Sequence, residues 1–121
     1  MRVGRWAPVV AWACVILIST SLPGAAVPAG PPGMDKVGHF VMYAVLGLFS
    51  IRAALSGAEP RLRSLALTLG AIAVFAAVDE WHQQFVPARA PDVADWAADL
   101  AGATVGVGSM AIFTLRRSAR S

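Results

Sequence analysis

The sequence contains little charge for its length. Only 14% of its 121 residues are Asp, Glu, Lys or Arg, whereas 57% are hydrophobic. An average soluble domain is about 25% charged, and a soluble chain of this size must cover a large surface relative to its volume. The shortage of charge therefore argues against an ordinary soluble domain and favours a protein embedded in the membrane lipid bilayer.

Several features that would point to other functions are missing. The single cysteine, Cys14, cannot form a disulfide within the chain, and we interpret it as a small buried or lipid-facing residue. The net charge is +3, but the basic residues are scattered at the ends of apolar runs and form no patch, so we expect no nucleic-acid partner. The chain has no HExxH motif, no tight His/Cys group, no phosphate loop and no nucleophile elbow. We therefore predict no metal and no cofactor, with a hard cation held by Asp and Glu as the alternative.

Four apolar segments are separated by Pro/Gly-rich or charged loops, which are typical helix breakers. A helix needs about 20 residues to cross the hydrocarbon core. We therefore predict an all-α membrane protein, a single domain over residues 1–121 with four transmembrane helices in a compact bundle. The expected helices cover residues of about 6–24, 35–56, 62–84 and 93–115.

The N-terminus allows a second interpretation. MRVGR followed by an apolar run and small residues resembles a secretory signal peptide. The apolar run is long for a signal sequence, and three more apolar segments follow it. We therefore expect the first helix to be retained rather than cleaved.

The basic residues predict the orientation of the helices. Eight of the ten lie before the first helix, between the second and third, or after the fourth; only Lys36 and Arg89 lie in the other loops. The positive-inside rule then places both termini in the cytoplasm. Six of the seven acids, all except Glu59, fall on the opposite side. We therefore expect a multi-pass protein of the bacterial cytoplasmic membrane with an acidic outer end.

Helical spacing aligns these acids with small residues. Asp95 and Asp99 share a face of the fourth helix with Gly102 and Gly106, and Asp35, His39 and Tyr43 recur every four residues on the second. Charge within the bilayer costs a few kcal/mol. We therefore expect the polar ends to face one another or a water-filled hollow, while the small residues allow close helix packing.

Two stretches carry a family resemblance. DKVGHFVMYAVLGL (35–48) resembles the Asp-Lys-x-x-His-Phe-x-x-Tyr-x-x-Leu signature of the VanZ-like family, and DEWHQQFVPARAPDVADWAADLAGATVG (79–106) resembles its second signature. The resemblance implies a small four-helix bacterial membrane protein, related to a founding member linked to low-level teicoplanin resistance. No biochemical activity is agreed for most members of the family.

The signature positions define the candidate site for a ligand or a polar cluster. They are Asp35, Lys36, His39, Tyr43, Glu80, Gln83, Arg89, Asp95 and Asp99. One departure is Ala88, where glycine commonly precedes the arginine, and this puts a positive-φ turn at that position in doubt.

Alternatives remain open for individual residues. Arg89 is either a fork for a ligand's carboxylate or phosphate or an internal clamp on Asp92, Asp95 or Asp99, and we favour the clamp. His39 is either a base or metal ligand or, as we favour, a hydrogen-bonded packing residue.

The residues leave several functions open. The preferred one is an outward-facing site for a cell-envelope lipid, a lipid-linked precursor or a glycopeptide. The alternatives are a membrane-embedded enzyme acting on envelope lipids, with Asp35, His39 and Glu80 as acid/base groups, and a structural or assembly protein. An ion or proton carrier is disfavoured because the cytoplasmic halves of the helices lack acids.

Overall fold

The computed structural model describes residues 3–22, 30 and 33–120. These residues form four α-helices and one short 3-10 helix, η1 (Val3–Trp6), with no strand among them. The α-helices are α1 (Ala7–Ser21), α2 (Met34–Leu55), α3 (Leu62–Gln83) and α4 (Val93–Ala119). All four are long and apolar enough to cross a membrane when η1 is counted with α1. The fold is therefore the expected all-α architecture.

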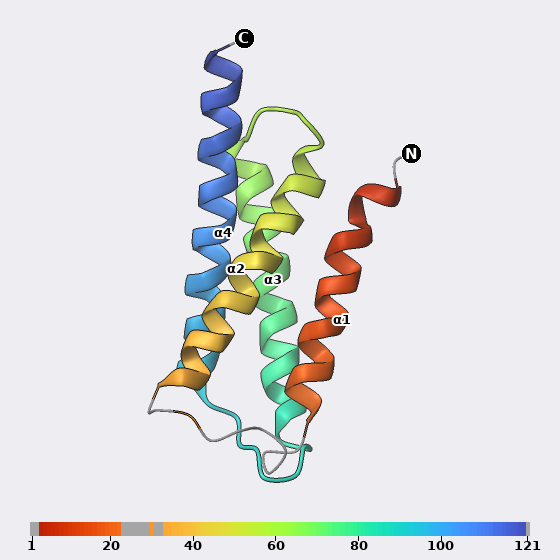
Figure 1. Cartoon of the computed structure of the whole chain (residues 1–121), viewed down its shortest axis with the longest axis vertical. Helices are drawn as coiled ribbons and strands as arrows, with labels where there is room; N and C mark the ends of the chain where they lie inside the picture. Colours follow the sequence, from red (N-terminus) through yellow and green to blue (C-terminus); the bar gives the residue numbers. More distant parts are fainter. Residues whose placement is uncertain (1–2, 23–29, 31–32, 121) are drawn as a thin grey trace.

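The helices run up and down in sequence, so that neighbours in the chain are antiparallel (Figure 1). Consequently Val3 and Arg120, the first and last described residues, lie at the same end of the bundle (Figure 1). The loop that joins α3 to α4 lies at the opposite end, together with the start of α2 and the end of α1. We call this second end the acidic end, because Asp35, Asp79, Glu80, Asp92, Asp95 and Asp99 all lie there.

The helix ends follow local sequence signals. Asp92 caps α4, where its side chain accepts a hydrogen bond from the backbone N–H of Ala94. At the end of α2, Ser56 and Gly57 adopt positive φ values of 47° and 87°, which stop the helix and turn the chain. Helix α1 ends when Leu22 becomes extended, as expected for a residue that precedes a proline.

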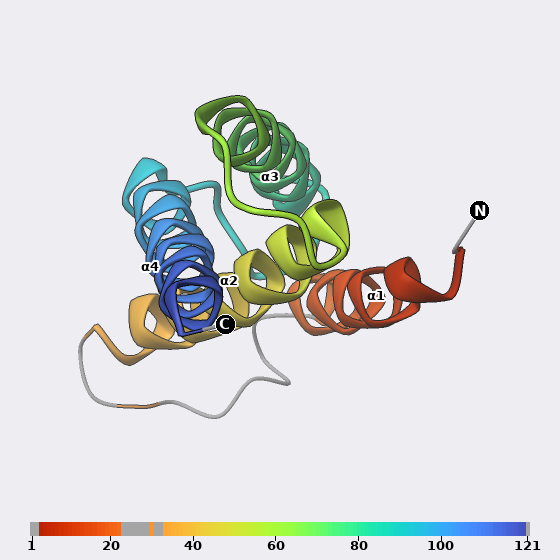
Figure 2. The same ribbon diagram turned by 90° about the horizontal axis from the view of Figure 1, so that it is seen from above.

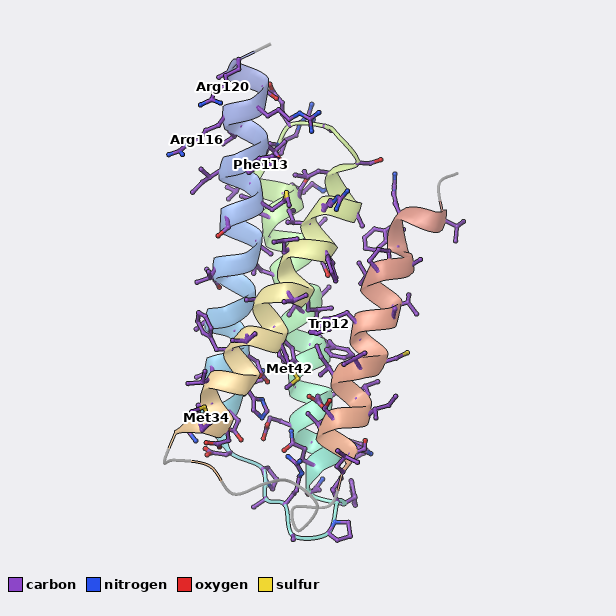
Figure 3. All side chains as sticks on the ribbon, viewed as in Figure 1. Trp12, Met34, Met42, Phe113, Arg116 and Arg120 are labelled. Atoms are coloured by element: carbon purple, nitrogen blue, oxygen red, sulfur yellow. The ribbon has the colours of Figure 1, made fainter. Side chains whose placement is uncertain are left out.

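The bounds of α2 and α3 agree with the sequence prediction to within one residue, and the larger differences are in α4 and α1. Helix α4 continues to Ala119 rather than ending at residue 115, because Arg116 and Arg117 are good helix formers and no Gly or Pro follows them. Helix α1 begins at Ala7 and ends at Ser21 instead of covering 6–24; residues 23 and 24 lie outside the described residues. Figure 3 shows Arg116 on the last turns of α4 and Arg120 at its C-terminal end.

The tightest packing in the bundle is between α2 and α4. A Cβ atom added to Gly102 would overlap the Phe40 carbonyl, one added to Gly106 would overlap the Ala44 carbonyl, and one added to Gly47 would lie 2.6 Å from the Ala103 carbonyl oxygen. Glycine at these positions therefore brings the two backbones into direct contact. Seen from above, α2 lies against α4, while α1 packs on the other side of α2 (Figure 2).

Tyr43, Leu46 and Ile72 belong to the apolar core, in which α1 takes part through Ile16. Trp12 of α1 donates a hydrogen bond of 2.8 Å to the Met42 carbonyl of α2 (Figure 3). Helix α1 thus has a polar tie to the bundle in addition to apolar packing. In contrast, many large apolar side chains of all four helices face outward, as expected for helices surrounded by lipid.

The glycine contact leads to the first prediction. Gly106→Ala should push α4 away from α2 and lower stability by about 1–3 kcal/mol, the usual cost of overpacking. Gly108→Ala on the same helix is the matched control, because its added Cβ would meet nothing within 4 Å. The control should leave stability unchanged or raise it, since alanine favours helix more than glycine. Thermal unfolding in detergent, followed by circular dichroism, compares the two; equal midpoints would contradict the tight contact.

Candidate functional site

Polar side chains at the acidic end form three groups. The outermost group is centred on Lys36, whose ammonium nitrogen lies 3.4 Å from Asp35, 3.2 Å from Asp92 and 3.2 Å from Asp95. These ion pairs join the start of α2 to the start of α4. Because Asp35 and Asp92 are largely exposed, their pairs with Lys36 contribute little to stability. The Ala94 N–H and then Lys36 lower the pKa of the Asp92 carboxyl.

Beneath Lys36 lies the group that we call the carboxylate–histidine cluster: His39, Glu80, Asp95 and Asp99. All four residues are buried, and they come from three helices. His39 Nδ1 lies 2.7 Å from Asp99 Oδ1, and His39 Nε2 lies 3.8 Å from Asp95 Oδ2. Close packing of α2 against α4 explains this convergence. Gly102 approaches the Phe40 carbonyl, and His39 is next to Phe40 while Asp99 lies three residues before Gly102.

Glu80 links the cluster to the turn between α3 and α4. Its Oε2 atom accepts a 2.8 Å hydrogen bond from the backbone N–H of Asp92, and its Oε1 atom accepts a 3.1 Å bond from the Gln83 amide. The same residue therefore ties the α4 N-terminus to α3 and contributes a carboxylate to the buried cluster. Gln83 is itself buried and orients Glu80.

The third group is centred on Asp79, which is only 1% exposed. Thr20 Oγ1 of α1 lies 2.6 Å from one of its carboxylate oxygens, and Tyr43 of α2 donates to the other at 3.1 Å. Asp79 thus joins three helices. From the sequence, a carboxylate within the membrane is expected to need hydrogen-bond or charged partners. Asp79 is not among the signature residues, however, and no sequence feature identifies Thr20 as its partner. A hydroxyl close to the end of the apolar α1 segment was the available signal.

Two expectations from the sequence are wrong in their detail. Asp35 lies outside the buried cluster: its side chain is 60% exposed in the first turn of α2, where it contacts Lys36. Arg89 contacts backbone carbonyls instead of the carboxylates of Asp92, Asp95 or Asp99. Its Nε donates to the Leu22 carbonyl at 2.8 Å, with a longer contact of 3.4 Å to the Ser19 carbonyl, so it ties the α3–α4 loop to the end of α1.

The turn before Arg89 is unusual for its residue type. Ala88 has a φ of 59°, in the left-handed region that glycine adopts most easily. The sequence put a positive-φ turn here in doubt, and that doubt is not borne out in the structure. The neighbouring Val86 is buried and its carbonyl accepts the Arg89 N–H, which helps to hold the turn.

A cavity of about 240 Å³ opens beside the cluster, between the end of α3 and the start of α4. Its lining consists of Ala77, Glu80, Trp81, Pro91, Asp92, Val93 and Trp96. Trp96 is half-buried and its indole N–H donates to the Ala73 carbonyl at 3.3 Å, whereas Trp81 is 61% exposed. The cavity therefore combines apolar and aromatic walls with two carboxylates.

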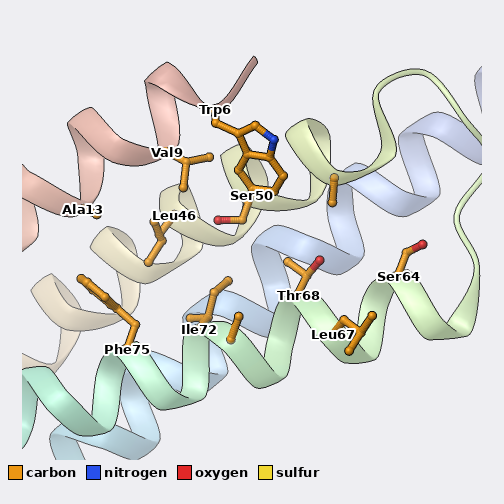
Figure 4. A pocket seen from close by; sticks show the side chains of 12 residues that line it. Trp6, Val9, Ala13, Leu46, Ser50, Ser64, Leu67, Thr68, Ile72 and Phe75 are labelled. Atoms are coloured by element: carbon orange, nitrogen blue, oxygen red, sulfur yellow. The ribbon is translucent and has the colours of Figure 1, made fainter. Parts of the chain in front are cut away.

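A second cavity, of about 460 Å³, lies between α1, α2 and α3 nearer the opposite end. Trp6 of η1 and Val9 of α1 face Leu46 and Ser50 of α2 across it, with Ile72 on the α3 side (Figure 4). No ionisable side chain lines it. This cavity therefore offers no acid or base to a ligand, unlike the cavity at the acidic end.

A known protein family matches most of this chain. The family model described as VanZ/LLP1 matches residues 5–114. The chain belongs to the VanZ/LLP1 family. The match covers all of α1, α2 and α3 and most of α4, and therefore includes every residue of the three polar groups. No curated protein and no solved structure matches the chain significantly. The VanZ-like chain is thus a membrane protein of four apolar helices, and its finer function has to be argued from its own residues.

The Asp79 group leads to the second prediction. Thr20→Val keeps the side-chain shape but removes the hydroxyl donor from a buried carboxylate, so the VanZ-like protein should lose about 1–3 kcal/mol of stability. Thr104→Val is the matched control, because its exposed hydroxyl donates only within α4, to the Leu100 carbonyl. Thermal midpoints in the same detergent provide the comparison. A Thr20→Val midpoint equal to that of the control would show that Asp79 does not depend on α1.

Proposed function

We propose that this VanZ-like protein is a multi-pass protein of the bacterial cytoplasmic membrane, with both termini in the cytoplasm and its acidic end outside. The distribution of charge supports this orientation: of the nine basic residues that the structure describes, seven lie near the end that carries Val3 and Arg120, and six of the seven acids lie at the other end. The even number of candidate spans agrees with termini on one side.

Two cysteine substitutions test the orientation. In a Cys14→Ala background, Ala90→Cys in the α3–α4 loop should react with a membrane-impermeant maleimide added to intact cells. Ala58→Cys in the α2–α3 loop should react only after the cells are opened. Both alanines are exposed, so burial does not limit either reaction. The reversed pattern would place the acidic end in the cytoplasm.

We further propose that the acidic end binds an amphiphilic molecule of the cell envelope: a lipid, a lipid-linked precursor or a glycopeptide such as teicoplanin. The observation that carries this proposal is the 240 Å³ cavity, whose walls are apolar and aromatic on one side and carry Glu80 and Asp92 on the other. Ligand pockets range from about 300 to 1,000 Å³. The cavity therefore suits one portion of a larger molecule.

The charges at the acidic end define the chemistry of that portion. Carboxylates accept hydrogen bonds and attract cations, so they favour amino and hydroxyl groups over phosphates. Lys36 is already paired with acids and does not reverse this preference. Trp81 and Trp96 supply flat apolar surfaces for a sugar ring or an aromatic group. Glycopeptides and lipid-linked saccharides combine these features.

Trp81 provides the sharpest test of binding, because it lines the cavity and is mostly exposed, so its removal should cost little stability. Trp81→Ala should weaken teicoplanin binding to the protein in nanodiscs by about 10-fold or more, as expected for an aromatic anchor. Val78→Ala is the matched control, since Val78 is 54% exposed on the same helix and does not line the cavity. Equal affinity for the two variants and the parent protein, measured by calorimetry, would contradict the site, and an absence of binding to the parent would exclude teicoplanin as its ligand.

One observation favours a second candidate, a membrane-embedded enzyme acting on envelope lipids. The 2.7 Å contact between His39 and Asp99, with Glu80 nearby, is an arrangement that can move protons. Turnover of envelope lipids by the purified protein, abolished by His39→Ala, would support it. Without turnover, the pair is a buried structural contact.

A further inference from the structure

Three members of the carboxylate–histidine cluster can be ligands of one metal ion. His39 from α2, Glu80 from α3 and Asp99 from α4 each offer a ligand atom, and these atoms lie within 4.8 Å of one another. Their exposed fractions are 6%, 8% and 0%. The three side chains therefore converge at the centre of the acidic end rather than on its surface.

The buried part of the acidic end has more carboxylates than positively charged side chains. Three buried carboxylates, those of Glu80, Asp95 and Asp99, lie close to His39, and a fourth, that of Asp79, is buried near the same end of α3. Within residues 3–22, 30 and 33–120, Lys36 is the one Lys or Arg within 4 Å of any of these carboxylates, at 3.2 Å from Asp95. Buried carboxylates require a counter-charge, a proton or hydrogen-bond donors. Asp79 and Glu80 each have two donors, whereas Asp95 is paired with Lys36 and Asp99 contacts His39 through one of its two oxygens.

An orphaned oxygen points to the same place. Asp99 is fully buried, and its Oδ2 atom has no hydrogen-bond partner in the part of the chain that the structure describes. Its Oδ1 atom is the one that contacts His39 Nδ1. An unpaired carboxylate oxygen at such a depth is costly. Coordination of a cation would satisfy both the oxygen and the missing charge.

We propose that His39, Glu80 and Asp99 bind one divalent transition-metal ion of the Zn²⁺ or Mn²⁺ type. An imidazole together with two carboxylates is a donor set that suits Zn²⁺ and Mn²⁺ better than Ca²⁺, which takes six to eight oxygen ligands. Zn²⁺ bonds to N and O are about 2.0–2.2 Å long, so the three ligand atoms need to close by only about an ångström. Asp95 lies 3.8 Å from His39 Nε2 and is a further buried carboxylate in the cluster.

This metal site does not depend on the proposed envelope ligand. Glu80 is nevertheless shared between the cluster and the lining of the 240 Å³ cavity. An ion held there would lie next to the cavity and would cross-link α2, α3 and α4 at their outer ends. Its presence can be measured directly on the protein, without any envelope molecule.

Metal content and stability test the site together. The purified protein is treated with EDTA, exchanged into buffer in nanodiscs, and then incubated separately with Zn²⁺, Mn²⁺ or Mg²⁺. We expect one equivalent of Zn²⁺ or Mn²⁺ per chain after desalting, measured by mass spectrometry of the elements, and a higher thermal midpoint. Co²⁺ should produce visible absorption bands of a bound ion in the unmodified protein, a readout that needs no variant.

Substitutions locate the ion. His39→Gln and Glu80→Gln should each lower Zn²⁺ affinity by about 10-fold or more. Asp79→Asn is the matched control, because Asp79 is an equally buried carboxylate outside the three ligands, and Asp35→Asn controls for surface binding. Retention of affinity in both controls supports the site. Fewer than about 0.2 equivalents of every metal together with no Co²⁺ bands, or equal affinity in all four variants, would overturn it.

Discussion

The contact between α2 and α4 determines the rest of the acidic end. Glycine at positions 47, 102 and 106 removes the side chains that would otherwise separate the two helices. In a lipid environment apolar burial does not drive helices together, so close backbone packing has to supply much of the attraction. One helical turn or less from this contact, His39 reaches Asp99, and Lys36 reaches Asp95 and Asp92. The polar groups therefore meet because the backbones meet.

The cost of burying charge then orders the polar groups by depth. Lys36 and its exposed partners remain near solvent, where ion pairs are weak but desolvation is small. Asp79 is nearly inaccessible, but two hydroxyl groups from different helices approach its two oxygens. Hydroxyl donors satisfy a carboxylate without bringing another charge into the membrane. This arrangement makes Asp79 a structural junction, and it explains how α1 is tied to a bundle whose main contact lies elsewhere.

Much of this organisation follows from the sequence, and the failures have physical causes. The apolar runs and their breakers predict four helices, and the spacing of Asp95, Asp99, Gly102 and Gly106 predicts the buried face of α4. The direction of side chains near helix ends cannot be read from spacing alone. Asp35 has the correct periodicity with His39 but lies in the first turn, where the bundle no longer covers it. Arg89 was paired with acids on charge alone, whereas the fold places two α1 carbonyls within its reach. Loop residues depend on tertiary contacts that no local pattern encodes.

The buried carboxylates differ in how many of their oxygens have a hydrogen-bond or ion-pair partner, and this difference is the most informative one. Asp79 has a donor for each oxygen, Glu80 has a backbone N–H and an amide, and Asp95 has Lys36. Asp99 is the most buried member of the cluster and has one partner, His39, for two oxygens. A purely structural role would favour an amide or a hydroxyl at this position, since either could be satisfied with less charge. The Asp99 carboxylate opposite the His39 imidazole therefore keeps one buried oxygen without a hydrogen-bond partner among the described residues, and the proposed metal site rests on that oxygen.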